Sequence, residues 1–207
     1  MANNHWRKSQ SQDPFVNSAH QESFRSRSHF KLKEIDKKYN IIKKNINCID
    51  LGSFPGGWSL YANKVIGNTG KVFSIDIKEM VSIPGVTFIQ GDFSDNQVCQ
   101  KLASQVNNLP INLVMSDIAP NITGNSLVDQ SRSIYLAEQA LKFSTFFLEY
   151  GGVFLVKLFQ GDGFENYING INEFFGKIKI IKPKASRKES REVFLLAKSF
   201  NFVRSDK

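Results

Sequence analysis

Short apolar runs alternate with helical patterns along most of the chain, and this alternation constrains the fold more than any other feature. Helical patterns cover about 28–39, 58–66, 95–106, 129–150 and 164–175. The runs that indicate strands are Asn47–Leu51, Lys71–Ile77, Val86–Gln90, Ile111–Ser116, Gly152–Phe159, Lys177–Ile181 and Glu192–Lys198. Strands joined by helices form a parallel or mostly parallel sheet with helices on both faces. The sequence therefore predicts an α/β fold.

The length of the chain, 207 residues, suits one such domain. We expect a flexible basic tail over residues 1–23 and a single domain over 24–207, acting as a monomer. Cys48 and Cys99 lie among apolar residues without metal-ligand spacing, which is typical of reduced core cysteines in a cytoplasmic protein. No apolar run approaches the length of a membrane span, and the N-terminus shows no hydrophobic signal segment.

The charge of the chain is +8 and is concentrated in two basic clusters, within residues 1–33 and 182–191. A strong positive charge favours a polyanionic partner, nucleic acid first, although solubility alone is an alternative interpretation. The two clusters can form one surface if the fold brings the ends of the chain together.

The first strand runs into the glycine-rich stretch DLGSFPGGW, Asp50 to Trp58. In parallel α/β sheets, ligands bind outside the carboxyl ends of the strands, and glycine lets the backbone approach a ligand closely. The spacing G-x-x-x-G-G differs from the dinucleotide fingerprint G-x-G-x-x-G, so a dinucleotide site is disfavoured. A tight turn between strand and helix remains the alternative.

Four aspartates end four successive strands: Asp50, Asp76, Asp92 and Asp117. Crowded carboxylates are costly unless something cationic or rich in hydroxyls lies among them. Asp76 follows Asp50 by 26 residues, near the offset at which an acid binds the ribose of an adenosine cofactor. A pyrophosphate would be repelled here, whereas S-adenosylmethionine carries a sulfonium, an ammonium and a ribose. The acids therefore favour a methyltransferase over a dehydrogenase.

Lys157 interrupts the apolar strand GGVFLVKLFQGDGF. Lysine is almost never fully buried without a partner, and Asp117 at the end of the neighbouring strand is the simplest one. A lysine that gives up its proton at this edge can act as a general base. The alternative is a buried ion pair that only joins the two strands.

Five stretches in order, RSRSHFKLKEID, DLGSFPGGWS, VMSDIAPNITG, FLVKLFQGDGF and SREVFLLA, resemble the bacterial RlmE (FtsJ/RrmJ) family of ribosomal RNA large subunit 2′-O-ribose methyltransferases. The resemblance covers about 24–198 and implies a class I methyltransferase fold, whose seven-stranded sheet has an antiparallel last strand. It also implies a catalytic tetrad of Lys31, Asp117, Lys157 and Glu192. The implied cofactor contacts are Gly56, Trp58, Asp76, Asp92 and Asp117. Ser53 and Phe54 stand where the family often has two alanines.

The resemblance further implies that the chain methylates the 2′-hydroxyl of a uridine in the A loop of 23S rRNA, within the large (50S) ribosomal subunit. S-adenosyl-L-methionine would supply the methyl group, and no metal would be needed. Lys157 would take the hydroxyl proton, Lys31 would stabilise the developing alkoxide, Asp117 would orient Lys157, and Glu192 would hold one of the lysines. The expected RNA contacts are Arg25, Arg27, Lys33, Lys184, Arg187, Lys188 and Arg191.

Two other functions remain open at this point. One is methylation of a tRNA anticodon loop, which would use the same catalytic residues with a different docking surface. The other is an RNA-binding factor in ribosome assembly for which methylation is incidental.

Overall fold

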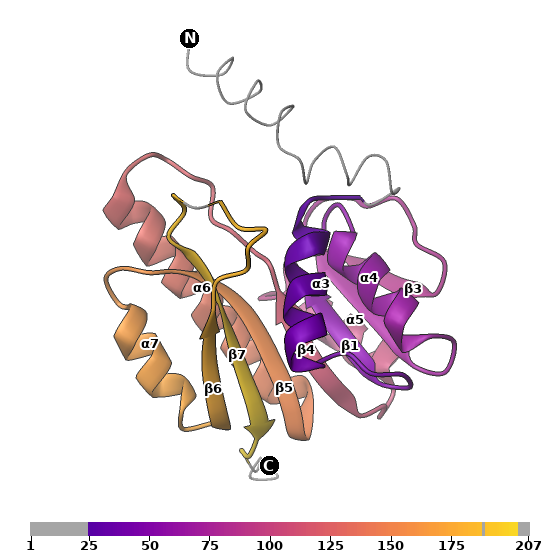
Figure 1. Ribbon diagram of the computed structural model, residues 1–207. Coiled ribbons are helices and arrows are strands. Elements are labelled where there is room, and N and C mark those ends of the chain that lie inside the picture. The colour runs from indigo at the N-terminus through magenta and orange to yellow at the C-terminus, as the bar shows by residue number, and fades with distance from the viewer. Residues whose placement is uncertain (1–24, 188, 203–207) are drawn as a thin grey trace.

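The computed structural model describes residues 25–187 and 189–202, which form a seven-stranded sheet with helices on both faces (Figure 1). The predicted tail over 1–23 lies outside the described residues. The strands are β1 (Asn47–Leu51), β2 (Lys71–Asp76), β3 (Val86–Gln90), β4 (Ile111–Ser116), β5 (Leu148–Phe159), β6 (Phe175–Ile181) and β7 (Glu192–Phe200). The helices are α3 (Ser28–Tyr39), α4 (Gly57–Ile66), α5 (Asn96–Val106), α6 (Ser126–Phe147) and α7 (Phe164–Ile171).

The strand order is β3-β2-β1-β4-β5-β7-β6, with β7 antiparallel to both of its neighbours and the other pairs parallel. This confirms the predicted class and the antiparallel last strand. Because β7 runs opposite to β5, its first residue lies where β5 ends, and Phe159 pairs with Glu192. The start of β7 therefore joins the carboxyl ends of the parallel strands at one edge of the sheet.

Each face of the sheet has its own hydrophobic core. Helices α5, α6 and α7 pack on one face through residues such as Leu102, Phe143 and Tyr167. Helices α3 and α4 pack on the other through Leu32, Ile35 and other buried side chains. Figure 1 views the face that carries α3 and α4. Successive residues of a strand point to opposite faces, so every central strand contributes to both cores.

Several predicted boundaries differ from the structure, most of all at two junctions between a helix and the next strand. Helix α6 ends at Phe147, three residues before the predicted end, and β5 begins directly at Leu148. The glycines predicted to stop the helix lie within β5 instead, where Gly151 has a φ of +81° and the register with β4 shifts. Helix α7 ends at Ile171 rather than near 175, because Phe175 starts β6 and packs in the sheet. Apolar periodicity alone does not distinguish these short apolar segments.

Within the described part of the chain, no helix combines the length and apolar character needed to cross a membrane.

Candidate active site

Lys157 and Asp117 form the ion pair that the sequence predicts. Ser116 at the end of β4 pairs with Val156 of β5, so the next residues of the two strands lie side by side. Lys157 Nζ lies 2.9 Å from Asp117 Oδ1 and donates a hydrogen bond to the main-chain oxygen of Asp117 at 2.5 Å. Lys157 is only 8% exposed, so this double contact fixes where its amine lies.

Lys31 and Glu192 form a second buried pair beside the first. Lys31 Nζ, from α3, lies 2.6 Å from Glu192 Oε1 and donates to Oε2 at 2.8 Å. Ser186 donates its hydroxyl to Glu192 Oε1 at 2.7 Å. A carboxylate that accepts from both an amine and a hydroxyl is held in one orientation, because each contact fixes an oxygen.

The two pairs meet around the ring of Phe194. Phe194 pairs with Lys157 across β5 and β7, and directly opposite residues of an antiparallel pair project to the same face. Glu192 lies two residues before Phe194 and therefore shares that face. Lys31 Nζ lies 5.7 Å from the centre of the Phe194 ring. Four segments distant in sequence thus bring the four predicted tetrad residues to one side of the sheet, under the start of α3.

Three of the predicted aspartates line one hollow of about 260 Å³ at the carboxyl edge, which we call the acidic hollow. Asp76 accepts the main-chain N–H groups of Phe54 and Lys78, both at 2.8 Å. Asp92 accepts the main-chain N–H and the hydroxyl of Ser94 through Oδ1, and its Oδ2 has no hydrogen bond among the described residues. Asp117 is the third aspartate that lines this hollow. The hollow therefore offers carboxylate oxygens whose remaining lone pairs can accept bonds from a ligand.

Asp50 lies buried next to the acidic hollow. Its Oδ2 accepts the hydroxyl of Ser59 at 2.6 Å, whereas its Oδ1 has no hydrogen-bond partner among the described residues. Burial raises the pKa of Asp50 to about 7, against a bond from Ser59 that lowers it, and the charges of Asp117 and Asp76 raise it further. The hydroxyl of Ser53 is also buried and unpartnered within the described residues. Crowded acids and unpartnered buried oxygens fit a ligand that brings a positive charge and hydroxyl groups.

The glycine-rich stretch shapes this edge through its backbone. Gly56 has a φ of +104°, and a Cβ there would lie 2.9 Å from both Ile83 Cδ1 and Met80 Sδ. Trp58 is 2% exposed, and its indole donates to the main-chain oxygen of Ser28 at 2.9 Å. The Trp58 ring is thus a core residue, so the cofactor contact predicted for Trp58 can come only from its backbone.

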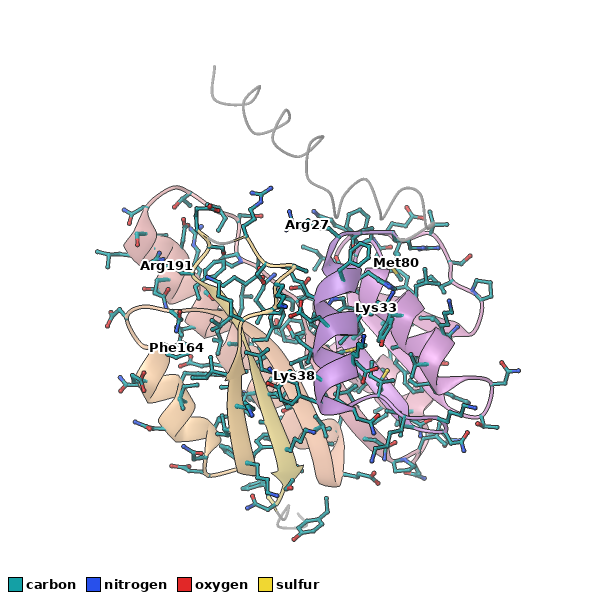
Figure 2. All side chains as sticks on the ribbon, in the orientation of Figure 1. Arg27, Lys33, Lys38, Met80, Phe164 and Arg191 are labelled. Atoms are coloured by element: carbon teal, nitrogen blue, oxygen red, sulfur yellow. The ribbon has the colours of Figure 1, made fainter. Side chains whose placement is uncertain are left out.

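The two basic clusters meet in a second hollow of about 310 Å³, the basic hollow, which includes both members of the Lys31–Glu192 pair. Its other lining residues are Arg27, Ile122, Phe159, Arg187 and Ser190. Arg27 donates to the main-chain oxygen of Ala185 at 2.8 Å, which ties the start of α3 to the loop before β7. Figure 2 shows Arg27 and Arg191 at the same upper end of the molecule. The predicted meeting of the clusters is therefore confirmed for the described residues.

The remaining predicted RNA contacts differ in their surroundings. Arg25 donates to the main-chain oxygens of Val81, Ser82 and Pro55, at 2.5, 2.9 and 3.3 Å. Its guanidinium therefore holds two loops together beside the acidic hollow. Arg191 donates to the Ser126 hydroxyl at 2.8 Å, while Lys33, Lys184 and Arg187 are exposed. Lys188 lies outside the described residues.

Several residues that support this site were not expected from the sequence. Ser186 orients Glu192, and no local pattern marks that serine. Asp129 accepts three bonds from Thr123 and Gly124, and the main-chain bond from Thr123 is the main reason that its pKa is lowered. The loop that Asp129 holds places Asn121 in the acidic hollow and Ile122 in the basic one. Asp129 could have been suspected from the sequence only because it is an acidic residue in the first turn of a helix, where a negative charge is favourable.

Among residues 25–187 and 189–202, no group of three or more His, Cys, Asp or Glu side chains could hold a metal ion. Cys48 and Cys99 are both free thiols, buried and half-buried respectively.

A family model and the curated relatives of this chain both point to methyltransferases. The model of the FtsJ-like methyltransferase family matches residues 24–200. A Neisseria meningitidis protein named ribosomal RNA large subunit methyltransferase E is 46% identical over 187 residues, covering 90% of this chain and 91% of that protein. A Pseudomonas aeruginosa protein of the same name is 44% identical over 195 residues, covering 94% of each.

Among solved structures, a Plasmodium falciparum protein described as a ribosomal RNA methyltransferase matches with a TM-score of 0.78 and 31% identity. The match covers 86% of this chain and 98% of that one. A Clostridium thermocellum protein matches with a TM-score of 0.54 at 18% identity, which supports the fold alone.

Proposed function

The chain belongs to the FtsJ-like methyltransferase family, and on that premise we propose that it transfers a methyl group from S-adenosyl-L-methionine to a ribose 2′-hydroxyl of large-subunit ribosomal RNA. The target we propose is a uridine in the A loop of 23S rRNA, within the 50S subunit. The observation that carries the proposal is the position of the two lysine–carboxylate pairs. Asp117 lines the acidic hollow and Glu192 lines the basic hollow, so the paired lysines lie between two sites suited to different ligands.

S-adenosyl-L-methionine fits the acidic hollow by its chemistry. Asp76 and Asp92 offer carboxylate oxygens to ribose hydroxyls and to the amino group of adenine. Asp117 provides negative charge that a sulfonium and an ammonium require, Asp50 adds to it once it has lost its proton, and Asp50 has an oxygen without a partner among the described residues. When bound, the cofactor supplies an electrophilic methyl group. The protein contributes position and charge.

Lys157 is the group that we assign to the proton of the 2′-hydroxyl. A hydroxyl is a weak nucleophile until its proton leaves, and the amine of Lys157 is the group that would accept this proton. Lys157 Nζ would take the proton as the hydroxyl oxygen becomes the nucleophile, and the methyl group that it attacks would be the one supplied by the bound cofactor. Asp117 holds the amine in place through two contacts and stabilises the ammonium that forms.

Lys31 supplies a fixed positive charge on the RNA side of the site. Glu192 and Ser186 keep its amine from moving, because the carboxylate is itself bound on both oxygens. A cation in this position would stabilise negative charge that develops on the ribose oxygen. Glu192 is therefore a positioning residue, and Lys31 acts electrostatically.

The basic hollow is suited to the nucleotide that carries the reacting ribose. Arg27 and Arg187 can contact phosphates on either side of the Lys31–Glu192 pair. Phe159 and Ile122 offer apolar surface to a base, and Ile122 is 64% exposed at the mouth of the hollow.

The test is methyl transfer from labelled S-adenosyl-L-methionine to isolated 50S subunits, free 23S rRNA and bulk tRNA in parallel, with the modified nucleotide mapped. We expect label in the ribosomal RNA, at a 2′-O-methyl uridine of the A loop, and none in tRNA. Label in tRNA alone would instead establish the anticodon-loop function. Strong binding to 50S subunits without any transfer would support the assembly-factor function.

A further inference from the structure

Three lysines contact Tyr39 at the end of α3 that is remote from the active site, and two more lie near Lys198, which is one of the three. The five are Lys38, Lys43, Lys177, Lys179 and Lys198, and we call them the Tyr39 cluster. Lys179 and Lys38 place their amines 5.3 and 5.5 Å from the centre of the Tyr39 ring. Lys198 donates to the main-chain oxygen of Tyr39 at 2.9 Å. Figure 2 shows Lys38 toward the lower end of α3, far from Arg27 at its upper end.

The register of β6 and β7 explains why three of these lysines share a face. Lys177 pairs with Lys198, and Lys179 pairs with Leu196, which belongs to the core beneath α3. Directly opposite residues project to the same face, so Lys177 and Lys179 lie on the α3 side of the sheet. Within the described chain, no helix covers β6 on this side in Figure 1. Lys177, Lys179, Lys198 and Tyr39 thus border a hollow of about 420 Å³.

The backbone conformation of Ser199 changes the face on which the following residue of β7 lies. Its φ of 62° lies in the left-handed region, which a non-glycine residue rarely adopts. The next residue, Phe200, packs in the core on the opposite face, together with its partner Phe175. Lys198 is therefore the last β7 residue that projects toward α3.

The positive charge of the Tyr39 cluster has no neutralising partner in the part of the chain that the structure describes. None of the five lysines forms an ion pair with any residue in the described ranges. Lys198 is half-buried, and burial followed by the charges of Lys43 and Lys177 lowers its pKa. Like charges held together reduce the stability of the folded state, and an anionic ligand would remove that cost.

A row of cations links the cluster to the active site. Lys177 and Lys179 alternate along β6, and the chain continues through Lys182 and Lys184 to Arg187 at the basic hollow. From Lys198 to Glu192, β7 extends over about 20 Å at roughly 3.3 Å per residue. One nucleotide in the basic hollow cannot reach the cluster, so an anion that contacts both must be an extended polymer.

We propose that the Tyr39 cluster binds the phosphate backbone of the substrate RNA, at a segment distant from the nucleotide that is methylated. This inference rests on the proposed function, because it takes the polyanion to be the RNA held in the basic hollow. A nucleic acid backbone carries one negative charge per nucleotide, which matches a row of regularly spaced lysines better than a compact anion does. The cluster would supply affinity and orientation without contributing to the chemistry.

The test compares the wild type with Lys177→Gln/Lys179→Gln, which removes two exposed charges from β6. The matched control is Lys101→Gln/Lys142→Gln, which removes two exposed charges from α5 and α6 on the other face. Binding to isolated 50S subunits and to free 23S rRNA is measured over a range of salt concentrations, together with kcat and KM for methyl transfer. Circular dichroism checks that both variants are folded.

We expect the β6 variant to bind RNA about 10-fold more weakly, with a log–log salt slope smaller by about 1 to 2, since each phosphate contact contributes roughly 0.7–0.9. Its KM for RNA should rise while kcat and cofactor affinity stay at the wild-type values. Equal RNA affinity and salt slope in the β6 and control variants would overturn the inference.

A third arm measures binding to vesicles that contain anionic phospholipid. Loss of vesicle binding with unchanged RNA binding would assign the cluster to a membrane surface and overturn the inference. The proposed function fails separately, if the wild type itself transfers no methyl group to 50S subunits or 23S rRNA.

Discussion

The lysines of this protein fall into two sets that differ in how their charge is balanced. Lys31 and Lys157 are each 8% exposed, and each lies within 3 Å of a carboxylate oxygen. The Tyr39 cluster contains five lysines with no ion pair among the described residues. A buried amine needs an internal partner, because leaving it unpaired would cost several kcal/mol. A crowded surface set without ion pairs among the described residues is suited to an external anion. The first set thus suits chemistry, and the second suits binding.

The strongest test of this contrast removes a paired lysine. Lys157→Ala should reduce kcat about 10²- to 10⁴-fold, the range typical of a general base, because Lys157 is the group that we assign to the reacting hydroxyl proton. Cofactor binding and RNA binding should stay within about 2-fold of the wild type. Single-turnover methyl transfer and calorimetric cofactor titration measure these quantities, with Lys142→Ala as the matched control. Near-normal turnover would remove Lys157 from the mechanism.

Asp50 is a buried carboxyl group without a cationic partner among the described residues, and its raised pKa gives a pH test. Between the ordinary aspartate pKa of 3.8 and the folded-state pKa of about 7, the folded protein keeps a proton that the unfolded chain has released. The free energy of unfolding should therefore fall as pH rises through this window and level off above 7. The full difference corresponds to about 4 kcal/mol.

Asp50→Asn should remove this contribution, so the difference in stability between variant and wild type should change across pH 4–8. Urea unfolding at pH 5, 6, 7 and 8 measures it. Parallel pH profiles of the two proteins would show that Asp50 titrates as in the unfolded chain.

A substitution of Glu192, the partner of Lys31, tests whether its negative charge is needed to hold Lys31 in position. Glu192→Gln keeps the shape of the side chain but removes the charge that holds Lys31, so we expect kcat to fall about 10- to 100-fold. The KM for RNA should change little. The pH profile of kcat should also shift, because a mobile Lys31 would influence Lys157 differently. An unchanged pH profile with a large loss of folding stability would assign Glu192 a structural role only.

Asp76→Ala tests whether the acidic hollow binds the cofactor, because it should lower cofactor affinity without lowering turnover. The loss of a charged acceptor should weaken S-adenosyl-L-methionine binding about 10-fold, as expected for a hydrogen bond to a charged group of roughly 1.5 kcal/mol. The kcat at saturating cofactor should remain close to that of the wild type. A loss confined to kcat would show that Asp76 does not contact the cofactor.

The smallest effect is expected at Arg187, which belongs to the basic row but not to the tetrad. Arg187→Glu should weaken RNA binding several-fold and flatten its salt dependence, because a phosphate contact is replaced by repulsion. Filter binding across salt concentrations measures both quantities. The same affinity and slope as the wild type would move the RNA surface away from the basic hollow.

Much of the site was predictable because its residues end strands. Topology places the carboxyl ends of parallel strands at one edge, so Asp76, Asp92, Asp117 and Lys157 could be assigned to it from the order of elements. The contacts between individual side chains were harder to predict from the sequence. The Trp58 indole packs in the core, Arg25 binds main-chain oxygens of two loops, and Ser186 holds Glu192. These contacts depend on loop conformations that local composition does not specify.

By itself, the sequence determined the α/β class and the edge of the sheet where the candidate site lies, and through family resemblance it predicted the four tetrad residues. Only the tertiary structure decided which of them pair. Lys31 and Glu192 are 161 positions apart and meet because β7 lies between β5 and β6 and begins at the carboxyl edge. The same insertion aligns Lys177 with Lys198 and creates the Tyr39 cluster. The alternation of apolar and polar residues predicts which face of the sheet each side chain of a strand lies on. Which side chain lies beside it on the neighbouring strand depends on strand order and register, and these are determined by segments distant in sequence.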